Sequence, residues 1–421
     1  MQETYKNPLG LTSQFSFCGL PFRLDTYAGC ALSCNYCFAR LRGGNSLSNR
    51  IRTADSVQII NRFKNAYQNP LTSTGIISEL IRNRSPLHFG GMSDPFQPIE
   101  KTKKVSYNVL KYLCSIEYPI VISTKSIIIA EDQYVNLLKS NPNILVQFSF
   151  STTQDNLSDL VEPSAFAPSE IMRAIEFLSK NGIKTSVRWQ PYIPGFSEEP
   201  EEFVSSFNNI GIKHIGFEHL KLPVEKNNPL WKKLSAKLNY DIRDYYLQNG
   251  SISDGRELIL PPEIKIKNAL KVKKECFTND ISFGSADNEI QYLSDNDCCC
   301  SGVDQFEGFE NFNKFQISYA IKKSRGERIT FNLISEEWRP SGSIDKHLNS
   351  KSRIERKDKF NNVEDYIHNR WENLNSPFNP SKFYGIKSTQ ERDENGFRIF
   401  DWDNNIIDIK NELDTEICQK Q

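Results

Sequence analysis

The chain has 421 residues, which leaves room for two or three domains of ordinary size. Its 52 Lys and Arg residues balance its 52 Asp and Glu residues, and a formal net charge of zero argues against a surface built as a whole for nucleic acid or anionic lipid. With 38% hydrophobic residues the chain can bury a core, which excludes global disorder. No window approaches the ~18 unbroken apolar residues of a membrane span, and the polar start is unlike a signal peptide, so we expect a cytoplasmic protein without a membrane partner.

In chain order, residues 1–20 predict a polar lead-in, and residues 21–262 alternate β-rich runs with amphipathic helical runs. Repeated strand–helix units indicate a parallel sheet with covered faces. Six such units predict an α/β fold, a partial (β/α)6 barrel, and a doubly wound open sheet is the competing architecture. The expected strands are Phe22–Ala28, Leu87–Gly90, Pro119–Ser123, Ile144–Phe150, Ile183–Trp189 and His214–Phe217. The expected helices are Asp55–Tyr67, Gly75–Asn83, Val105–Cys114, Asp132–Lys139, Glu170–Lys180 and a longer one over Leu230–Leu247.

The remainder of the chain predicts an α+β extension in two parts. Residues 263–335 form a cysteine-containing accessory region, and residues 336–421 form a polar C-terminal extension that we expect to be a surface helix or arm. Cations are frequent from Arg339 onward, and a solvated face is the commoner meaning of such a run. In the accessory region, phenylalanines at a spacing of three predict one packed face of a helix. They are Phe306, Phe309, Phe312 and Phe315.

Three cysteines near the N-terminus follow the first expected strand at the spacing CxxxCxxC. They are Cys30, Cys34 and Cys37. Three thiolates on one short loop can reach three corners of a cubane 4Fe–4S cluster, whereas an electron-transfer cluster takes four. With no fourth cysteine nearby, one iron keeps an open position, which is typical of catalytic metal sites. A loop that follows a barrel strand also lies where such folds build active sites.

Two other interpretations of this loop use fewer of its thiols. Cys34 and Cys37 alone form a CxxC pair, which could be a thioredoxin-like dithiol or half of a zinc site. The dithiol leaves Cys30 unused, and the zinc site would need a distant partner pair within Cys298–Cys300. The cubane is favoured because the triplet's spacing and its position after a strand agree.

With Tyr36 just before its last cysteine, the triplet resembles the signature of the radical S-adenosylmethionine (SAM) superfamily. The run His88–Glu100, with its sequence HFGGMSDPFQPIE, is similar to a loop of the spore photoproduct lyase-like branch. Ser123–Ser126 and Pro191–Gly195 also fit that branch, so the resemblance covers about residues 20–220.

The resemblance implies a partial barrel of the radical SAM type and an enzyme that binds a 4Fe–4S cluster and SAM. In that family the reduced cluster cleaves SAM to a 5′-deoxyadenosyl radical, which abstracts hydrogen from a substrate that the sequence does not identify. An electron donor such as flavodoxin or ferredoxin is implied as a partner. The lyase-like branch points to a nucleic-acid lesion as substrate, but the zero net charge does not support that substrate. The lyase also keeps a hydrogen-donating thiol in a region that corresponds to the stretch between Cys37 and Cys114, and this chain has no cysteine there.

The resemblance also suggests residues that contact SAM. Gly90 and Gly91 match a glycine-rich motif that binds its amino group, with Met92 at the usual Glu position and Asp94 or a backbone carbonyl as substitute. Lys125 would pair with its carboxylate. The other expected cofactor-binding residues are Ser123, Ser149 and Ser151, which offer hydroxyls, and Arg188, which needs an anionic partner in a ligand or in an internal salt bridge.

Late cysteines predict a second metal site, either an auxiliary iron–sulfur cluster or zinc. Its candidate ligands are Cys276, Cys298, Cys299 and Cys300. A redox thiol that acts during turnover and a set of buried free cysteines are the alternatives. For the whole protein, the rival to an enzyme is a non-catalytic iron–sulfur or zinc protein, such as an electron carrier or a binding module.

Overall fold

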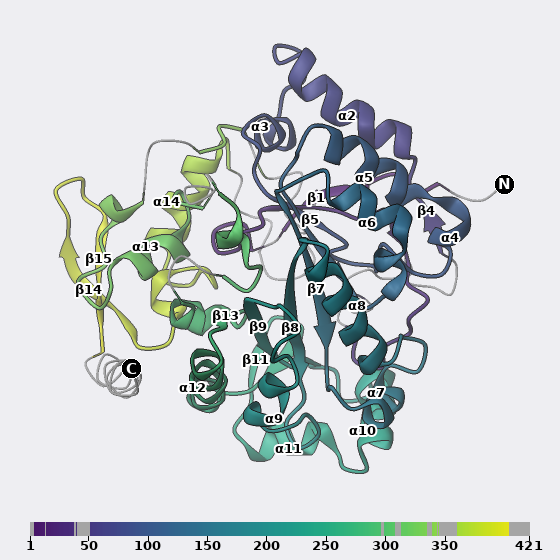
Figure 1. The fold of residues 1–421 in the computed structure, drawn as a ribbon. Coiled ribbons are helices and arrows are strands. Elements are labelled where there is room, and N and C mark those ends of the chain that lie inside the picture. Colours follow the sequence, from purple (N-terminus) through teal and green to yellow (C-terminus); the bar gives the residue numbers. More distant parts are fainter. Residues whose placement is uncertain are drawn as a thin grey trace.

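The computed structural model describes residues 4–12, 14–37, 39, 51–295, 299–307, 313–334, 339–342, 344 and 360–403. Its centre is an eight-stranded sheet with the order β1-β2-β5-β6-β7-β8-β9-β13 (Figure 1). Within this sheet β1 pairs antiparallel with β2, and every later pair is parallel. The strands are Leu9–Leu11 (β1), Phe22–Leu24 (β2), Leu87–Phe89 (β5), Ile120–Thr124 (β6), Ile144–Phe150 (β7), Lys184–Tyr192 (β8), His214–His219 (β9) and Ser282–Ser285 (β13).

The α/β fold class and the six parallel strands expected from the sequence are confirmed. The order from β2 through β9 never reverses, whereas a doubly wound sheet needs a reversal, so the open partial barrel is the observed architecture. The helices are Ser56–Gln68 (α2), Ile76–Arg82 (α3), Glu100–Lys103 (α4), Val105–Ser115 (α5), Asp132–Leu138 (α6), Asp155–Val161 (α7), Pro168–Lys180 (α8), Pro200–Ser205 (α9), Pro229–Leu238 (α10), Ile242–Gln248 (α11), Pro262–Thr278 (α12), Ile317–Lys323 (α13) and Val363–Glu372 (α14).

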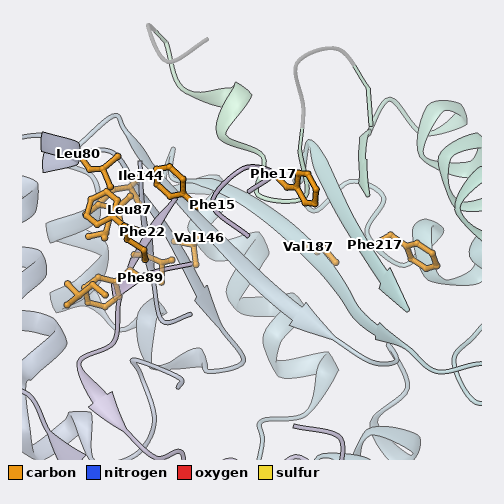
Figure 2. Close-up of a cluster of buried hydrophobic side chains, with 14 of the residues drawn as sticks. Phe15, Phe17, Phe22, Leu80, Leu87, Phe89, Ile144, Val146, Val187 and Phe217 are labelled. Carbon is orange, nitrogen blue, oxygen red and sulfur yellow. The ribbon is translucent and has the colours of Figure 1, made fainter. Parts of the chain in front are cut away.

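The two faces of the sheet differ in chemistry because successive side chains of a strand point to opposite sides. Phe22, Leu87 and Val187 belong to the large buried core on the helix-covered face, where α8 packs on β7 and β8 (Figure 2). The residues that follow Phe22 and Val187 along their strands, Arg23 and Arg188, line a cavity on the other face. The alternation therefore builds a core on one side and a polar interior on the other.

Residues 9–12 and 14–20 are part of the fold, contrary to the expected polar lead-in. Phe15 and Phe17 are buried, and their partners come from the accessory region and from the C-terminal extension. The Phe15 ring centroid lies 5.6 Å from that of Phe315, and the Phe17 centroid lies 4.9 Å from that of Phe383. The polar composition of the segment does not indicate that Phe15 and Phe17 are buried, because their partners Phe315 and Phe383 lie three hundred or more residues later in the chain.

The single helix expected over Leu230–Leu247 is in fact two helices. Asn239 adopts the left-handed conformation at φ 60°, which ends α10. Asp241 then caps α11 by accepting hydrogen bonds from Arg243 N and Asp244 N.

The expected phenylalanine stripe is wrong for the part of the segment that the structure describes. Phe306 packs in a small cluster with Leu20 and Val121, whereas Phe315 packs in the large core. Residues 299–307 and 313–316 contain a short 3₁₀ turn at Val303–Gln305 and no α-helix. Phe309 and Phe312 lie outside the described residues.

The C-terminal extension packs against the 3₁₀ segment Asn288–Leu293 that follows β13. It contains a hairpin of β14 (Ile386–Arg392) and β15 (Arg398–Trp402), drawn in yellow in Figure 1. The expected surface helix is wrong for α14, because Tyr366 and Trp371 on it are fully buried. The cation-rich run falls mostly outside the described residues. Of the helices in the described ranges, none combines the length and apolar character that a bilayer crossing requires.

Candidate active site

The three N-terminal cysteines lie on one loop that follows β3 (Tyr27–Ala28), just beyond the carboxyl end of β2. Gln97, from the loop after β5, holds this segment with both ends of its amide. Its Oε1 accepts from Ala31 N at 2.9 Å, and its Nε2 donates to Gly29 O at 3.0 Å. These two bonds fix the backbone at the start of the loop.

The second half of the loop is fixed against the end of α7. Asn35 donates through its backbone N–H to Val161 O at 2.8 Å and through its side chain to Leu160 O at 3.0 Å. The residues that hold the two halves of the loop, Gln97 and the end of α7, are far from it in sequence, so tertiary contacts order the loop.

The loop thiols are free and lie in a setting that suits metal binding. The backbone N–H groups of Asp94 and Leu32 donate to the sulfur of Cys30, an arrangement that tunes iron–sulfur ligands. Burial, and then the charge of Asp94, raise the pKa of Cys30 to about 12. Burial, and then Glu162, also raise the pKa of Cys34. Binding a cation here must therefore release protons, which couples metal affinity to pH.

No three His, Cys, Asp or Glu side chains among the described residues converge on one ion-sized point. A mononuclear zinc site requires such convergence. A cubane does not, because each of three thiolates binds a different iron.

Lys125 is the centre of a buried network beside the cysteine loop. Its Nζ lies 3.0 Å from Glu162 Oε1 and donates to Ser149 O at 2.8 Å. Ser151 Oγ donates to the same Glu162 oxygen at 2.6 Å, and Tyr36 OH also donates to it. Glu162 thus ties the cysteine loop to the end of β6, and no pattern in the sequence indicated it.

The carboxylate of Asp94, expected to contact the cofactor, is engaged in hydrogen bonds within the protein. Its carboxylate accepts from Thr124 Oγ1 at 2.9 Å, from Lys125 N at 2.7 Å and from Phe96 N at 2.8 Å. With these bonds it fixes the end of β6 from behind the site. The same motif supplies Gln97 and Glu100, and Glu100 accepts from Tyr134 OH at 2.8 Å and from Tyr27 OH. The motif residues act mainly as a frame.

Gly90 and Gly91 bring bare backbone to the end of β5. Gly90 has φ +91°, and a Cβ on it would lie 2.8 Å from Ser123 O, so a side chain does not fit there. A Cβ on Gly91 would lie 3.0 Å from Arg23 Cδ. Close packing against the neighbouring segments therefore requires glycine at Gly90 and leaves little room for a side chain at Gly91.

A cavity of about 370 Å³ lies against the polar face of the sheet. That size suits a cofactor or a small substrate. The sequence-predicted residues that line it are Cys34, Cys37, Gly90, Gly91, Ser123, Lys125, Ser149, Arg188, Cys299 and Cys300, whereas Cys30, Asp94 and Ser151 are not part of the lining.

The far wall of the cavity is the segment that contains Cys299 and Cys300. It rests on two glycines of the sheet, because a Cβ on Gly216 would lie 2.6 Å from Cys300 O and one on Gly284 would lie 2.4 Å from Cys299 O. Gln147 Nε2 donates to Cys300 O at 2.8 Å. The segment is thus seated on the polar face by backbone contacts.

Cys276 does not join these late cysteines. It is buried on α12 within the core of the helix-covered face, together with Phe283. Cys299 packs with Val121 and Leu145 on the opposite face. The sheet therefore separates Cys276 from Cys299 and Cys300, so the four expected ligands cannot share one metal, and Cys298 lies outside the described residues.

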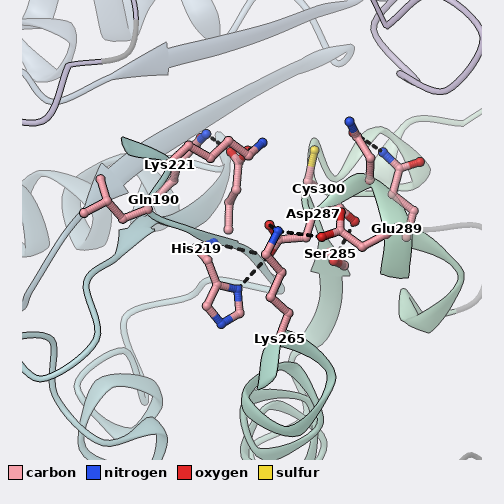
Figure 3. Close-up of polar contacts among 12 residues, drawn as sticks. Gln190, His219, Lys221, Lys265, Ser285, Asp287, Glu289 and Cys300 are labelled. Carbon is pink, nitrogen blue, oxygen red and sulfur yellow. Dashed lines mark hydrogen bonds and ion pairs between the residues drawn. The ribbon is translucent and has the colours of Figure 1, made fainter. Parts of the chain in front are cut away.

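His219 lines the cavity, but both of its ring nitrogens are engaged. Figure 3 shows its ring beside Lys265 and Asp287. Nδ1 lies 2.7 Å from Asp287 Oδ2, and Nε2 lies 3.0 Å from Asn268 Nδ2. Lys265 Nζ lies 3.1 Å from Asp287 Oδ1. Burial would raise the pKa of Asp287, but Lys265 and His219 outweigh it and hold that pKa below its usual value. This network joins α12 to the ends of β9 and β13.

The rim residue Glu218 is also occupied. Gln190 and Lys221 both donate to its carboxylate. On the cavity side of β5, burial, and then Arg188, lower the pKa of His88 to about 3, so this histidine is neutral and bonds Ser123 Oγ at 2.8 Å.

No family model matches the chain. An uncharacterised protein of Methanocaldococcus jannaschii, MJ0683, is 28% identical over 181 residues, which are 42% of this chain and 62% of that protein. The matched part therefore spans less than two thirds of the relative.

Among solved structures, a spore photoproduct lyase variant with bound AdoMet and dinucleoside spore photoproduct is similar at 13% identity and a TM-score of 0.46, over 64% of this chain and 78% of that one. The radical S-adenosylmethionine methyltransferase TsrM of Kitasatospora setae is similar at 13% identity and a TM-score of 0.35, over 51% of this chain and 39% of that one. The branch that the sequence motifs resemble is thus represented among these structures.

Proposed function

We propose that this protein is a radical SAM enzyme in which Cys30, Cys34 and Cys37 bind three irons of a 4Fe–4S cluster. The observation that supports this most directly is a fixed loop with three free thiols, two of which open onto a large cavity. The next cysteine in the sequence after Cys37 is Cys114, which is buried in the core of the helix-covered face. The fourth iron would therefore lack a cysteine from this loop and stay open for SAM.

When bound and reduced, the cluster would supply the electron that cleaves SAM to methionine and a 5′-deoxyadenosyl radical. The residues around it would bind and orient. Lys125 uses two of its three N–H groups on Glu162 and Ser149, which leaves one for the carboxylate of SAM. Gly90 and Gly91 would admit the amino group along bare backbone.

The cavity beyond these residues would hold the substrate, from which hydrogen is abstracted. We propose a flavodoxin or ferredoxin as the electron donor and the reducing cytoplasm as the location, since the loop thiols must stay free. A lyase-like reaction belongs to the same proposal. Zero net charge argues against a substrate that is held through a nucleic-acid backbone.

The test is anaerobic reconstitution of the wild type and of Cys34→Ala, with Cys114→Ser as the matched control. We expect about four irons per chain and dithionite-dependent formation of 5′-deoxyadenosine for the wild type and the control. Cys34→Ala should lose SAM cleavage while keeping the fold. A colourless protein with zinc, or 5′-deoxyadenosine formed by Cys34→Ala, would contradict the proposal and favour a non-catalytic metalloprotein.

A further inference from the structure

We infer that Arg188 binds an oxyanion of the substrate, a carboxylate or a phosphate, at the far wall of the cavity. This inference rests on the proposed function for its link to catalysis. It differs from the sequence-based expectation, which gave Arg188 to the cofactor.

Arg188 projects into the cavity from the middle of β8. Its strand neighbours are Ser149 on β7 and Gly216 on β9, and Ser149 lines the cavity beside it. Its Nη2 lies 3.6 Å from Cys300 Sγ, a long contact to a weak acceptor. Its Nε is buried without a hydrogen-bond partner. Among the residues that the structure describes, Arg188 forms no ion pair.

Other cations that line the cavity have carboxylate partners. Arg23 Nη1 lies 3.5 Å from Asp25, Lys125 Nζ lies 3.0 Å from Glu162, and Lys221 pairs with Glu218. A guanidinium that stays charged without a partner is costly to enclose, and a bidentate oxyanion is the ligand that its geometry fits best. Arg188 therefore brings to the cavity a positive charge that no carboxylate of the described residues compensates.

The position of Arg188 points to the substrate and not to SAM. Its guanidinium reaches the Cys300 segment, which sits over Gly216 of β9. Lys125 is held on the other side of Ser149, by Glu162 beyond the end of α7. A ligand carboxylate beside the cysteine loop would meet Lys125, which leaves Arg188 for a second anion.

Cys300 gives a direct reporter, because its sulfur lies beside the guanidinium. Anaerobic holoprotein is treated with iodoacetate, which is an anion, or with neutral iodoacetamide, and alkylation at Cys300 is followed by peptide mass spectrometry. Both reagents attack the same thiolate, so its pKa cancels in the ratio of their rates. We expect the ratio of the iodoacetate rate to the iodoacetamide rate to be about tenfold higher in the folded protein than in the urea-unfolded chain. The reason is that the positive charge of Arg188 concentrates the anionic reagent.

Two variants separate charge from structure. Arg188→Gln should return the ratio to the unfolded value, and Arg188→Lys should keep most of it. In the wild type, inorganic phosphate and acetate, tested separately at matched ionic strength, should slow alkylation by iodoacetamide. The more protective of the two indicates whether the substrate group is a phosphate or a carboxylate.

Saturating SAM shows whether the anionic group that binds Arg188 belongs to the substrate or to SAM. If the inference is correct, the anion still protects Cys300 in the presence of SAM, and Arg188→Gln leaves SAM affinity unchanged. An equal ratio in folded and unfolded chains overturns the inference, as does SAM that displaces the anion and binds Arg188→Gln about tenfold more weakly. Loss of the cluster assignment with the anion effect intact would refute the proposed function alone.

Discussion

The two ends of the cavity are built in different ways. At the cysteine end the three thiols lie close together in the sequence, although Gln97 fixes their loop from a distance through bonds to Gly29 and Ala31. The far wall comes from residues near Cys300, which reach the sheet through Gly216 and Gly284. The thiols of the first end can therefore be predicted from their spacing in the sequence. The far wall cannot, because it depends on which distant segments come together in the fold.

Gln97→Leu should have the largest effect on the cysteine end, because it removes both amide bonds to the loop backbone at once. We expect a loss of about 2–3 kcal/mol in the free energy of unfolding and less than about half of the wild-type iron content after reconstitution. Iron analysis and thermal unfolding measure the two effects. Wild-type iron content in this variant would mean that the loop does not depend on Gln97.

Gly216→Ala should disturb the far wall and spare the cysteine end. The new Cβ would lie 2.6 Å from Cys300 O, so the segment must shift, at a cost of about 1–3 kcal/mol. Gly10→Ala is the matched control, since the nearest atom to its Cβ would be 3.7 Å away. We expect faster alkylation of Cys300 in Gly216→Ala with unchanged iron content. Coupled loss of iron would show that the two ends are not independent.

His88→Gln should give the smallest effect, visible only in acid. Burial, and then Arg188, lower the pKa of folded His88 to about 3, below the value of ~6.5 in the unfolded chain. As the pH falls from about 6.5 toward 3, the unfolded chain binds a proton that the folded chain does not, so the wild type loses stability. The variant should resist acid by about 1–2 kcal/mol at pH 5, as measured by urea unfolding at several pH values. Parallel pH profiles of the two proteins would contradict this.

The sequence predicted six of the seven parallel strands of the central sheet, because each is a short apolar run, and it missed β13, whose sequence SFGS is not one. It also singled out the cysteine triplet and most of the residues that line the cavity. It missed Glu162, Lys265 and Asp287, since a buried ion network leaves no periodic pattern. It also treated residues 1–20 as a lead-in, because Phe15 and Phe17 find their partners only in the folded chain. Local periodicity reports strands and helices, and it does not report which segments meet.

Magnetic resonance of the reduced, oxygen-free protein with SAM labelled at its amino nitrogen tests the central assignment most directly. A cubane with a vacant iron predicts a hyperfine coupling between that nitrogen and the cluster, lost in Cys34→Ala together with the cluster itself. A cubane whose fourth iron already carries a protein ligand, with no coupling to labelled SAM, would contradict the assignment.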